Sequence, residues 1–415
     1  MNRDLPDTTA QIFNKKERNL LIFTGLSHAI CDAWHLIYPA LLFLIAVDYN
    51  DFFFLGLIAN IMIIFRGFAG VASGILADKY SSKLIYSGFA VLSALGCFLV
   101  YFSSNQIMLV CSFAVLGMGT GIYHPVGLSS ITRFVKSKTR ALGLHESAGC
   151  IGMGLIPILL TSIGLSFGWR YAFLTAGFIS LIPLLLIPII DEQYDKFQIP
   201  NANNQKISQQ IKSVIKTFGD PLVLLTYAIL IIGEASATGL DTFMPIAVAE
   251  IGGLKEGKVI GLSLTGLFVS LMVLAGVPGS IYGGILGSKI GIYKSLNLIL
   301  AIQIPILILI TITSGVWLLV LAPFVRLLTN MRSPLTNALI SENIPLEMHG
   351  KGFAIMYGIA PIIGGLVALL GGAIAKFYGL NWVFPVIAIL IALSFPMIKA
   401  SSRLSELKEN KETTL

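Results

Sequence analysis

Three ionisable residues share one face of an apolar segment near the start of the chain. His28, Asp32 and His35 are spaced i, i+4 and i+7 within residues 20–47, so a helix places all three on one side. An ionisable side chain at the centre of a bilayer costs at least about 2.5–3.5 kcal/mol, so each one needs a partner, water or a function. A carboxylate beside imidazoles can load and release a proton near neutral pH. We therefore expect Asp32 and His28 to couple transport to protons, and His35 to contact a substrate.

A second set of charges lies in the other half of the sequence. Glu234 and Asp241 are also spaced i, i+7, and an offset of 209 residues carries Asp32 onto Asp241. These two carboxylates are further candidates for proton coupling. Arg326 and Arg332 are candidates for substrate binding, because they could pair with a carboxylate in one conformation and with a substrate in another.

Two histidines stand in local contexts that allow different roles. His124 precedes Pro125, so it could contact substrate, act as a gate, or only satisfy the backbone group that proline frees. His145 is followed by Glu146, but Gly149 stands where a zinc protease motif needs its second histidine. We expect a solvated helix end there, with Glu146 in a structural or gating role.

The remaining polar candidates have simpler expectations. Arg66 lies in a span away from the other charges, and we expect a structural role for it. Four cysteines lie inside apolar segments without the spacing of a metal site, and we expect buried free thiols and no metal. These are Cys31, Cys97, Cys111 and Cys150.

The elements that must position these residues are membrane helices. Of 415 residues, 55% are hydrophobic and only 12% are charged, against roughly 25% charged in a soluble domain. Apolar runs of about 20 residues, long enough to cross a bilayer, recur along the whole chain. They predict twelve transmembrane helices, at about 20–47, 52–76, 84–104, 107–131, 141–164, 171–190, 221–248, 259–286, 293–313, 316–340, 352–375 and 380–398.

Basic residues predict which side of the membrane each loop faces. The tails and even-numbered loops hold 21 Lys and Arg residues, and the opposite loops hold four. The positive-inside rule then places both termini, including tails 1–19 and 399–415, in the cytoplasm, for a multi-pass protein of the inner (cytoplasmic) membrane. The net charge of +7 is this asymmetry, so we expect lipid and not nucleic acid as its counterpart.

The two halves of the chain resemble each other at a nearly constant offset. Gly74-Ile75-Leu76 matches Gly284-Ile285-Leu286 at 210 residues, and the segment from Gly168 matches the segment from Gly379 at 211. The matches run in the same direction. They predict two parallel-repeat six-helix bundles, residues 20–190 and 221–398, joined by a cytoplasmic linker at 191–220.

A short motif follows the second predicted span. The segment Gly74-Ile75-Leu76-Ala77-Asp78-Lys79-Tyr80-Ser81-Ser82-Lys83 resembles the G-x-x-x-D-[RK]-x-G-[RK]-[RK] signature of the major facilitator superfamily. Gly74 would allow close helix packing, Asp78 would cap or pair at a helix end, and Lys79 and Lys83 would hold the loop at the headgroups. The resemblance implies an all-α fold in which the first, fourth, seventh and tenth spans line a central cavity.

A closer resemblance covers most of the first half. Ser27-His28 followed by Asp32, and Gly117-Met118-Gly119-Thr120-Gly121-Ile122-Tyr123-His124-Pro125, are similar to patterns of the fosmidomycin-resistance-like efflux branch. That branch is associated with proton-driven drug export.

These observations predict a secondary active transporter that has no cofactor and functions as a monomer. The favoured function is proton-coupled export of a small organic solute, by antiport. The alternatives are symport of an organic anion recognised by Arg326 and Arg332, divalent-metal transport through His28, Asp32 and His35, and a non-transporting sensor or assembly component. An enzyme is not expected, because the sequence has no phosphate-binding glycine loop beside a strand and no nucleophile elbow.

Overall fold

The first half of the chain folds into a bundle of long helices. A computed structural model describes residues 13–49, 52–77, 80–195, 217–254, 258–259 and 262–413. The motif residues Asp78 and Lys79 and most of the 191–220 linker lie outside this part of the chain. The elements of the first half are α1 (Lys15–Asp48), α2 (Phe52–Ala77), α3 (Ser82–Phe102), α4 (Gln106–Phe134), α5 (Lys138–Phe167), α6 (Trp169–Ser180), α7 (Ile182–Leu186), η1 (Ile187–Ile189) and η2 (Glu192–Tyr194).

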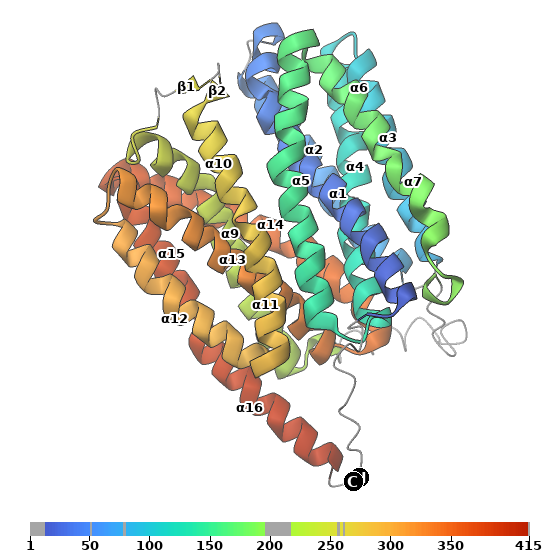
Figure 1. Ribbon diagram of the computed structural model, residues 1–415, viewed down its shortest axis with the longest axis vertical. Coiled ribbons are helices and arrows are strands. Elements are labelled where there is room, and N and C mark those ends of the chain that lie inside the picture. Colours follow the sequence, from blue (N-terminus) through green and yellow to red (C-terminus); the bar gives the residue numbers. More distant parts are fainter. Residues whose placement is uncertain are drawn as a thin grey trace, which may run out of the picture.

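The second half forms a matching bundle beside the first (Figure 1). Its elements are α9 (Pro221–Glu250), β1 (Lys258–Val259), β2 (Leu262–Ser263), α10 (Leu264–Leu274), α11 (Gly276–Ile290), α12 (Ile292–Ile310), α13 (Val316–Asn343), η4 (Leu346–Met348), α14 (His349–Tyr378), η5 (Leu380–Trp382), α15 (Val383–Ala392) and α16 (Ser394–Thr413). The antiparallel β1–β2 pair is a minor departure from the predicted all-helical chain.

The twelve predicted spans coincide with helices or with pairs of consecutive helices. Eleven helical segments of the described residues are long and apolar enough to cross a membrane. The helix α14, which covers the predicted span 352–375, is the twelfth. Three predicted spans are interrupted near proline, because proline has no N–H to continue the hydrogen-bond ladder. The interruptions lie at Leu181 before Pro183, at Ala275 before Pro278 and at Leu393 before Pro396. The fold is therefore an all-α membrane fold of two six-helix halves.

The backbone repeats where the sequence repeats. Gly168 follows α5 with φ 101° and ψ 147°, and Gly379 follows α14 with φ 100° and ψ 155°. This positive φ is readily adopted only by glycine. The offset of 211 residues found in the sequence thus joins two positions with the same turn between consecutive spans.

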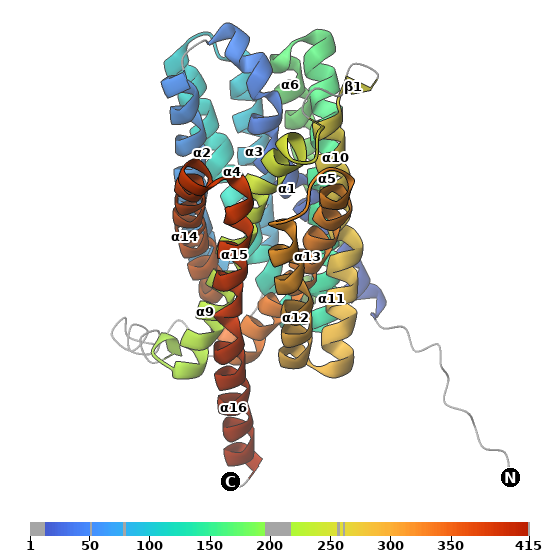
Figure 2. The ribbon, with the colours of Figure 1, turned by 90° about the vertical axis from the view of Figure 1, so that its left-hand side faces the viewer.

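One end of the bundle carries most of the basic loop residues, and we call it the basic end. It includes the start of α1, where Asn14 and Glu17 form a capping box and Glu17 Oε1 also accepts a hydrogen bond from the backbone of Lys136 at 3.0 Å. The helix α16 extends beyond the bundle at this same end (Figure 2). The first and last helices therefore both reach the basic end.

The two halves are packed tightly together at the basic end. Gly143 of α5 and Gly284 of α11 lie backbone to backbone, and Gly74 of α2 lies against Ala354 of α14. The motif glycine Gly74 is therefore a point of close contact between α2 and α14. A Cβ on Gly284 would lie 2.6 Å from the carbonyl oxygen of Thr139.

Hydrogen bonds join the halves in the same region. Arg140 Nε donates to Ser288 Oγ at 3.0 Å, and Thr132 Oγ1 lies 2.9 Å from His349 Nδ1. Arg133 Nε donates to the carbonyl oxygen of Leu346 at 3.3 Å. The structure is therefore a state in which the halves are closed at the basic end.

A larger residue at Gly284 should open this contact. Gly284→Val would overpack the α5–α11 interface, which costs about 1–3 kcal/mol. A cost of this size changes the ratio of closed to open molecules severalfold. Spin labels at Lys83 and Lys294, in a Cys111→Ser background, should then report longer distances across the basic end. Gly372→Val is the control, because a Cβ there has no neighbour within 4 Å. Unchanged distances in Gly284→Val would show that this glycine does not govern closure.

Candidate functional site

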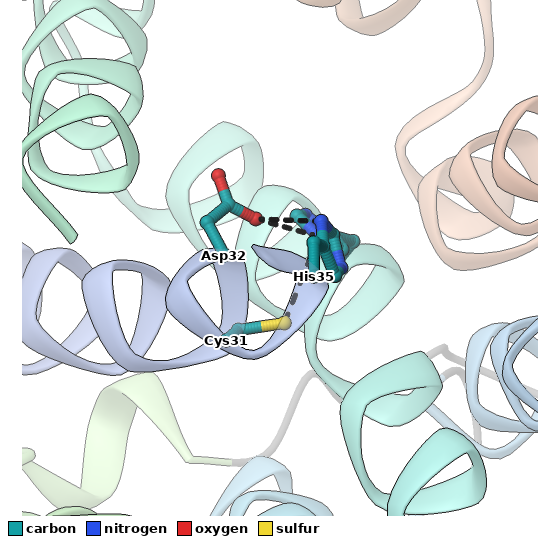
Figure 3. Close-up of side chains that lie close together, drawn as sticks. Cys31, Asp32 and His35 are labelled. Atoms are coloured by element: carbon teal, nitrogen blue, oxygen red, sulfur yellow. Dashed lines mark hydrogen bonds and ion pairs between the residues drawn. The ribbon is translucent and has the colours of Figure 1, made fainter. Parts of the chain in front are cut away.

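The helix α1 brings its three ionisable residues to the centre of the first half. Asp32 is buried, and its two oxygens face different partners. His28 Nε2 lies 3.1 Å from Oδ2, whereas His35 Nδ1 lies 3.7 Å and His124 Nε2 3.2 Å from Oδ1. Figure 3 shows Asp32 and His35 close together beside Cys31. The predicted neighbours of Asp32 on α1 are therefore in contact with it, and His124 of α4 joins them.

The hydrogen bonds of His28 define where a proton must lie. His28 Nδ1 lies 2.7 Å from the carbonyl oxygen of His145, which can only accept, so Nδ1 carries a hydrogen. In a neutral imidazole Nε2 would then present a lone pair to Asp32 Oδ2. Two acceptors at 3.1 Å repel each other unless a proton lies between them. The pair therefore holds one proton more than a neutral imidazole and a carboxylate would.

The helix α5 encloses this pair from the other side. The ring of His145 stacks on the ring of His28, with centroids 4.0 Å apart and planes inclined by 8°. Two small residues permit this approach: a Cβ on Gly149 would lie 2.5 Å from Asp32 Oδ2, and a Cβ on Gly152 would overlap the backbone of Ala29. The glycines of α5 therefore bring the backbone close enough for the carbonyl of His145 to reach His28.

The other oxygen of Asp32 is left without a hydrogen bond. Asp32 Oδ1 is buried and unpartnered among the described residues, although two imidazoles point toward it. Cys31 Sγ lies 3.7 Å from His124 Nε2 and also 3.3 Å from the carbonyl oxygen of Thr120. The ring of His124 stacks on Tyr357 of the second half, with centroids 4.5 Å apart. This side of Asp32 thus lies at the boundary between the halves.

Glu146 lies between the halves, so the prediction of a solvated helix end was wrong. Its Oε2 accepts from Ser333 Oγ at 2.9 Å, and its Oε1 accepts from Asn337 Nδ2 at 3.1 Å. Both donors belong to α13. The misplacement arose because α5 begins at Lys138, so Glu146 is already two turns inside the helix. A gating role, the other part of the prediction, remains a proposal.

The charges of the second half are arranged differently from those of the first. Arg326 Nη1 donates to Asp241, and the side chain of Asp241 is 55% exposed. Arg332 is buried and donates to the carbonyl oxygen of Gly233 at 2.9 Å and to Gln303 Oε1 at 3.3 Å. Both arginines are therefore engaged within their own half in this state.

Two further charged residues have no such partners. Among the described residues, neither the guanidinium of Arg66 nor the carboxylate of Glu234 makes a hydrogen bond or an ion pair. Arg66 interacts electrostatically with Cys31, Asp32 and Tyr357, so it lies near the Asp32 site. The expected structural pairing of Arg66 is not found in this part of the chain.

Several residues of the site were not predicted from the sequence. His145 and Tyr357 reach it from other helices, and Gly149 is needed for the approach of α5. Cys31 is a buried free thiol, as expected, but it lies beside ionisable groups, whereas Cys111 is exposed and not buried. The chain has only five histidines, and four of them lie in this one site. This scarcity of histidine is the signal that could have drawn attention to His145.

Groups of metal-ligand type also occur within the described residues. One contains Cys31, Asp32, His35 and His124, and the other contains His28, His145 and Glu146. The first group has its donor atoms within 4.8 Å of one another. Of the three residues that the sequence offered as metal ligands, Asp32 and His35 fall in one group and His28 in the other.

Gly149 offers a direct test of the contact between α1 and α5. Gly149→Ala places a methyl group 2.5 Å from Asp32 Oδ2 and 2.7 Å from His28 Cε1, and we expect destabilisation by about 1–3 kcal/mol. The measurement is the midpoint of thermal unfolding in detergent. Gly25→Ala is the matched control, because its Cβ would meet Ala148 at an ordinary 3.5 Å across the same interface. Equal midpoints for the two variants would contradict the packing described above.

Known membrane transporters are similar to this chain in sequence. The multidrug resistance protein MdtG of Rahnella sp. (strain Y9602) is 23% identical over 340 residues, which cover 81% of this chain and 80% of that protein. The probable sulfoacetate transporter SauU of Cupriavidus necator is 24% identical over 238 residues, 53% of each chain. This chain thus spans about half the length of SauU.

The fold is also found among solved structures. A crystal structure of the E. coli fucose:proton symporter FucP superposes with a TM-score of 0.72 at 16% identity, covering 92% of this chain and 99% of that one. The family model described as Major Facilitator Superfamily matches residues 22–329. With that match over most of its length, this chain belongs to the major facilitator superfamily.

Proposed function

We propose that this chain exports a small organic solute across the inner membrane in exchange for protons. Membership of the superfamily makes it a multi-pass membrane protein and a secondary transporter. The coupling ion and the direction are our proposal. The observation that carries it is the placement of His28 between the carbonyl oxygen of His145 and Asp32 Oδ2, from which we infer a proton between His28 and Asp32.

The surroundings of Asp32 suit a group that gains and loses this proton. Three imidazoles surround the carboxylate of Asp32. Among the described residues, it makes no ion pair with an arginine. Imidazole can exchange its proton near neutral pH, whereas a guanidinium stays charged. The Asp241–Arg326 pair of the second half lacks that property, so Asp32 and His28 are the proton site, and Asp241 with Glu234 has a secondary role.

The proton site is joined to the contact between the halves through one short segment of α5. The carbonyl of His145 accepts from His28, and the next side chain, Glu146, accepts from Ser333 and Asn337 of α13. A change of protonation at His28 would weaken or strengthen its bond to this carbonyl and so move Glu146. Glu146 would thereby transmit the proton state to the closed basic end.

Export is supported by the relative and by the sequence motifs. MdtG is named a multidrug resistance protein, and the Ser27-His28 and His124-Pro125 patterns are similar to an efflux branch. In an exporter, the state closed at the basic end would release cargo and take up a proton. The reverse state would release the proton and bind cargo from the cell, through His35, His124, Arg326 and Arg332.

The same proposal orients the protein. The basic end faces the cytoplasm by the positive-inside rule, which places both termini there and makes the present state outward-facing. Lys83 would lie at the cytoplasmic headgroups. The predicted tails 1–19 and 399–415, the bundles 20–190 and 221–398, and function as a monomer all stay part of this proposal.

Neutralising Asp32 should separate binding from coupling. Asp32→Asn cannot give up the proton, so proton-coupled transport should fall at least about 100-fold while cargo binding stays measurable, since loss of acid–base function commonly costs 10²–10⁴-fold. The measurement is proton flux in proteoliposomes with a pH-sensitive dye, across a panel of organic cations and anions.

The same assay has a control on the same helix. Asp48→Asn makes the identical change at the far end of α1, where the carboxylate pairs with Arg170 at 3.0 Å, and flux should be retained. Proton flux at the wild-type level in Asp32→Asn would refute the coupling role.

A second candidate function, uptake of an organic anion by proton symport, is favoured by Arg66. This cation has no hydrogen bond or ion pair among the described residues and lies near Asp32 and Tyr357. Arg326 and Arg332, which the sequence offered for this role, are already bonded within their half. The relative SauU, a probable sulfoacetate transporter, has a cargo of this class.

The two candidates differ in what Arg66 does. Under anion uptake, Arg66→Gln should weaken binding of a carboxylate or sulfonate cargo by at least about tenfold, because a charged hydrogen bond contributes roughly 1.5–3 kcal/mol. Binding is measured by calorimetry on purified protein. Arg170→Gln, outside the site, is the control, and anion affinity that is equal in both variants would remove this candidate.

A further inference from the structure

The strongest feature outside the proposed proton pair is the group of donor atoms on the other side of Asp32. Cys31, Asp32, His35 and His124 each offer one ligand atom, and these atoms lie within 4.8 Å of one another. The group combines a thiol, a carboxylate and two imidazoles. This mixture is typical of sites for Zn²⁺ and related transition-metal ions.

Three of the separations between donor atoms are close to those of a tetrahedral site. With bonds of about 2.0–2.3 Å, ligand atoms around Zn²⁺ lie about 3.3–3.8 Å apart. His124 Nε2 lies 3.2 Å from Asp32 Oδ1 and 3.7 Å from Cys31 Sγ, and His35 Nδ1 lies 3.7 Å from Asp32 Oδ1. The remaining pairs lie within 4.8 Å of one another, so the group must contract to take up an ion.

The polar atoms of this group are otherwise poorly satisfied. Asp32 Oδ1, His35 Nε2 and His124 Nδ1 are buried without a hydrogen bond among the described residues. A buried polar atom without a partner costs about 1–3 kcal/mol. The two nearby imidazoles do not remove that cost, because neither makes a hydrogen bond to Asp32 Oδ1. An ion bonded to Asp32 Oδ1 would remove it.

Charge also fits a divalent ion at this depth. A thiolate and a carboxylate carry two negative charges, so a divalent ion makes the four-ligand group neutral, which suits the membrane interior. Arg66 is a nearby positive charge that opposes the ion and favours the thiolate. His28 is held by the carbonyl of His145 with its Nε2 toward the other oxygen of Asp32, so it would not bind the ion.

We propose that Cys31, Asp32, His35 and His124 form a binding site for a transition-metal ion of the Zn²⁺ class. The side chain of His35 is 19% exposed, so it is the ligand most accessible from outside the site. The ion displaces the thiol proton of Cys31, which then no longer donates to Thr120.

The site has a consequence for coupling that rests on the proposed function. An ion on Asp32 competes with the proton that Asp32 carries, so micromolar Zn²⁺ should inhibit proton flux. Binding itself does not depend on the proposed function.

The test uses Co²⁺, because its thiolate complexes absorb strongly in the near ultraviolet. Purified full-length protein, stripped with a chelator, should develop this charge-transfer absorption on titration and lose it when Zn²⁺ is added. Cys31→Ser should abolish it, and the serine hydroxyl can still donate to Thr120, which preserves the fold. Cys97→Ser is the matched control, since Cys97 is equally buried but lies on α3.

A second variant keeps the thiolate and changes another ligand. His35→Gln, at the most exposed of the four, should retain the absorption and weaken the Co²⁺ Kd by at least about tenfold. No thiolate absorption in the wild-type protein, or absorption that survives Cys31→Ser, would overturn the proposal. Proton flux measured with chelator present tests the proposed function alone, so the two ideas fail separately.

Discussion

The hydrogen bond between His28 Nδ1 and the carbonyl oxygen of His145 is the constraint on which the site depends. It fixes the tautomer of His28, which in turn requires a proton between His28 and Asp32. The bond exists only because α5 approaches α1 closely at Gly149 and Gly152. The close packing of α1 against α5 thus decides the protonation of Asp32. The carbonyl oxygen of His145 is the atom through which this packing acts on the charge of the site.

The two halves hold their intramembrane carboxylates by different means. Asp32 is surrounded by imidazoles, whose charge can change, whereas Asp241 is paired with Arg326, whose charge cannot. The halves share a helix arrangement and the glycine turns after α5 and α14. Under the proposed function, two similar halves thus hold one carboxylate each, and only Asp32 has a variable proton content.

The helices were predictable from sequence, and the depth of individual side chains was less so. Length and hydropathy located all twelve spans, because the bilayer imposes a minimum apolar run. The i, i+4, i+7 spacing correctly placed His28 and His35 around Asp32, since that relation is local to one helix. Glu146 was misplaced, because α5 extends well beyond its apolar part. Contacts such as those of His145 and Tyr357 depend on how helices pack, which no spacing within one helix specifies.

The glycine contacts at the basic end bear on the speed of the transport cycle. Where Gly143 meets Gly284, backbone touches backbone, so closing the halves there immobilises few rotamers. Forming or breaking a contact of this kind changes the conformational entropy of side chains very little. A few hydrogen bonds, such as that of Arg140 with Ser288, add to this contact in the closed state. Under the proposed function, the turnover rate would be limited by the binding and release of cargo and protons more than by the movement of one half against the other.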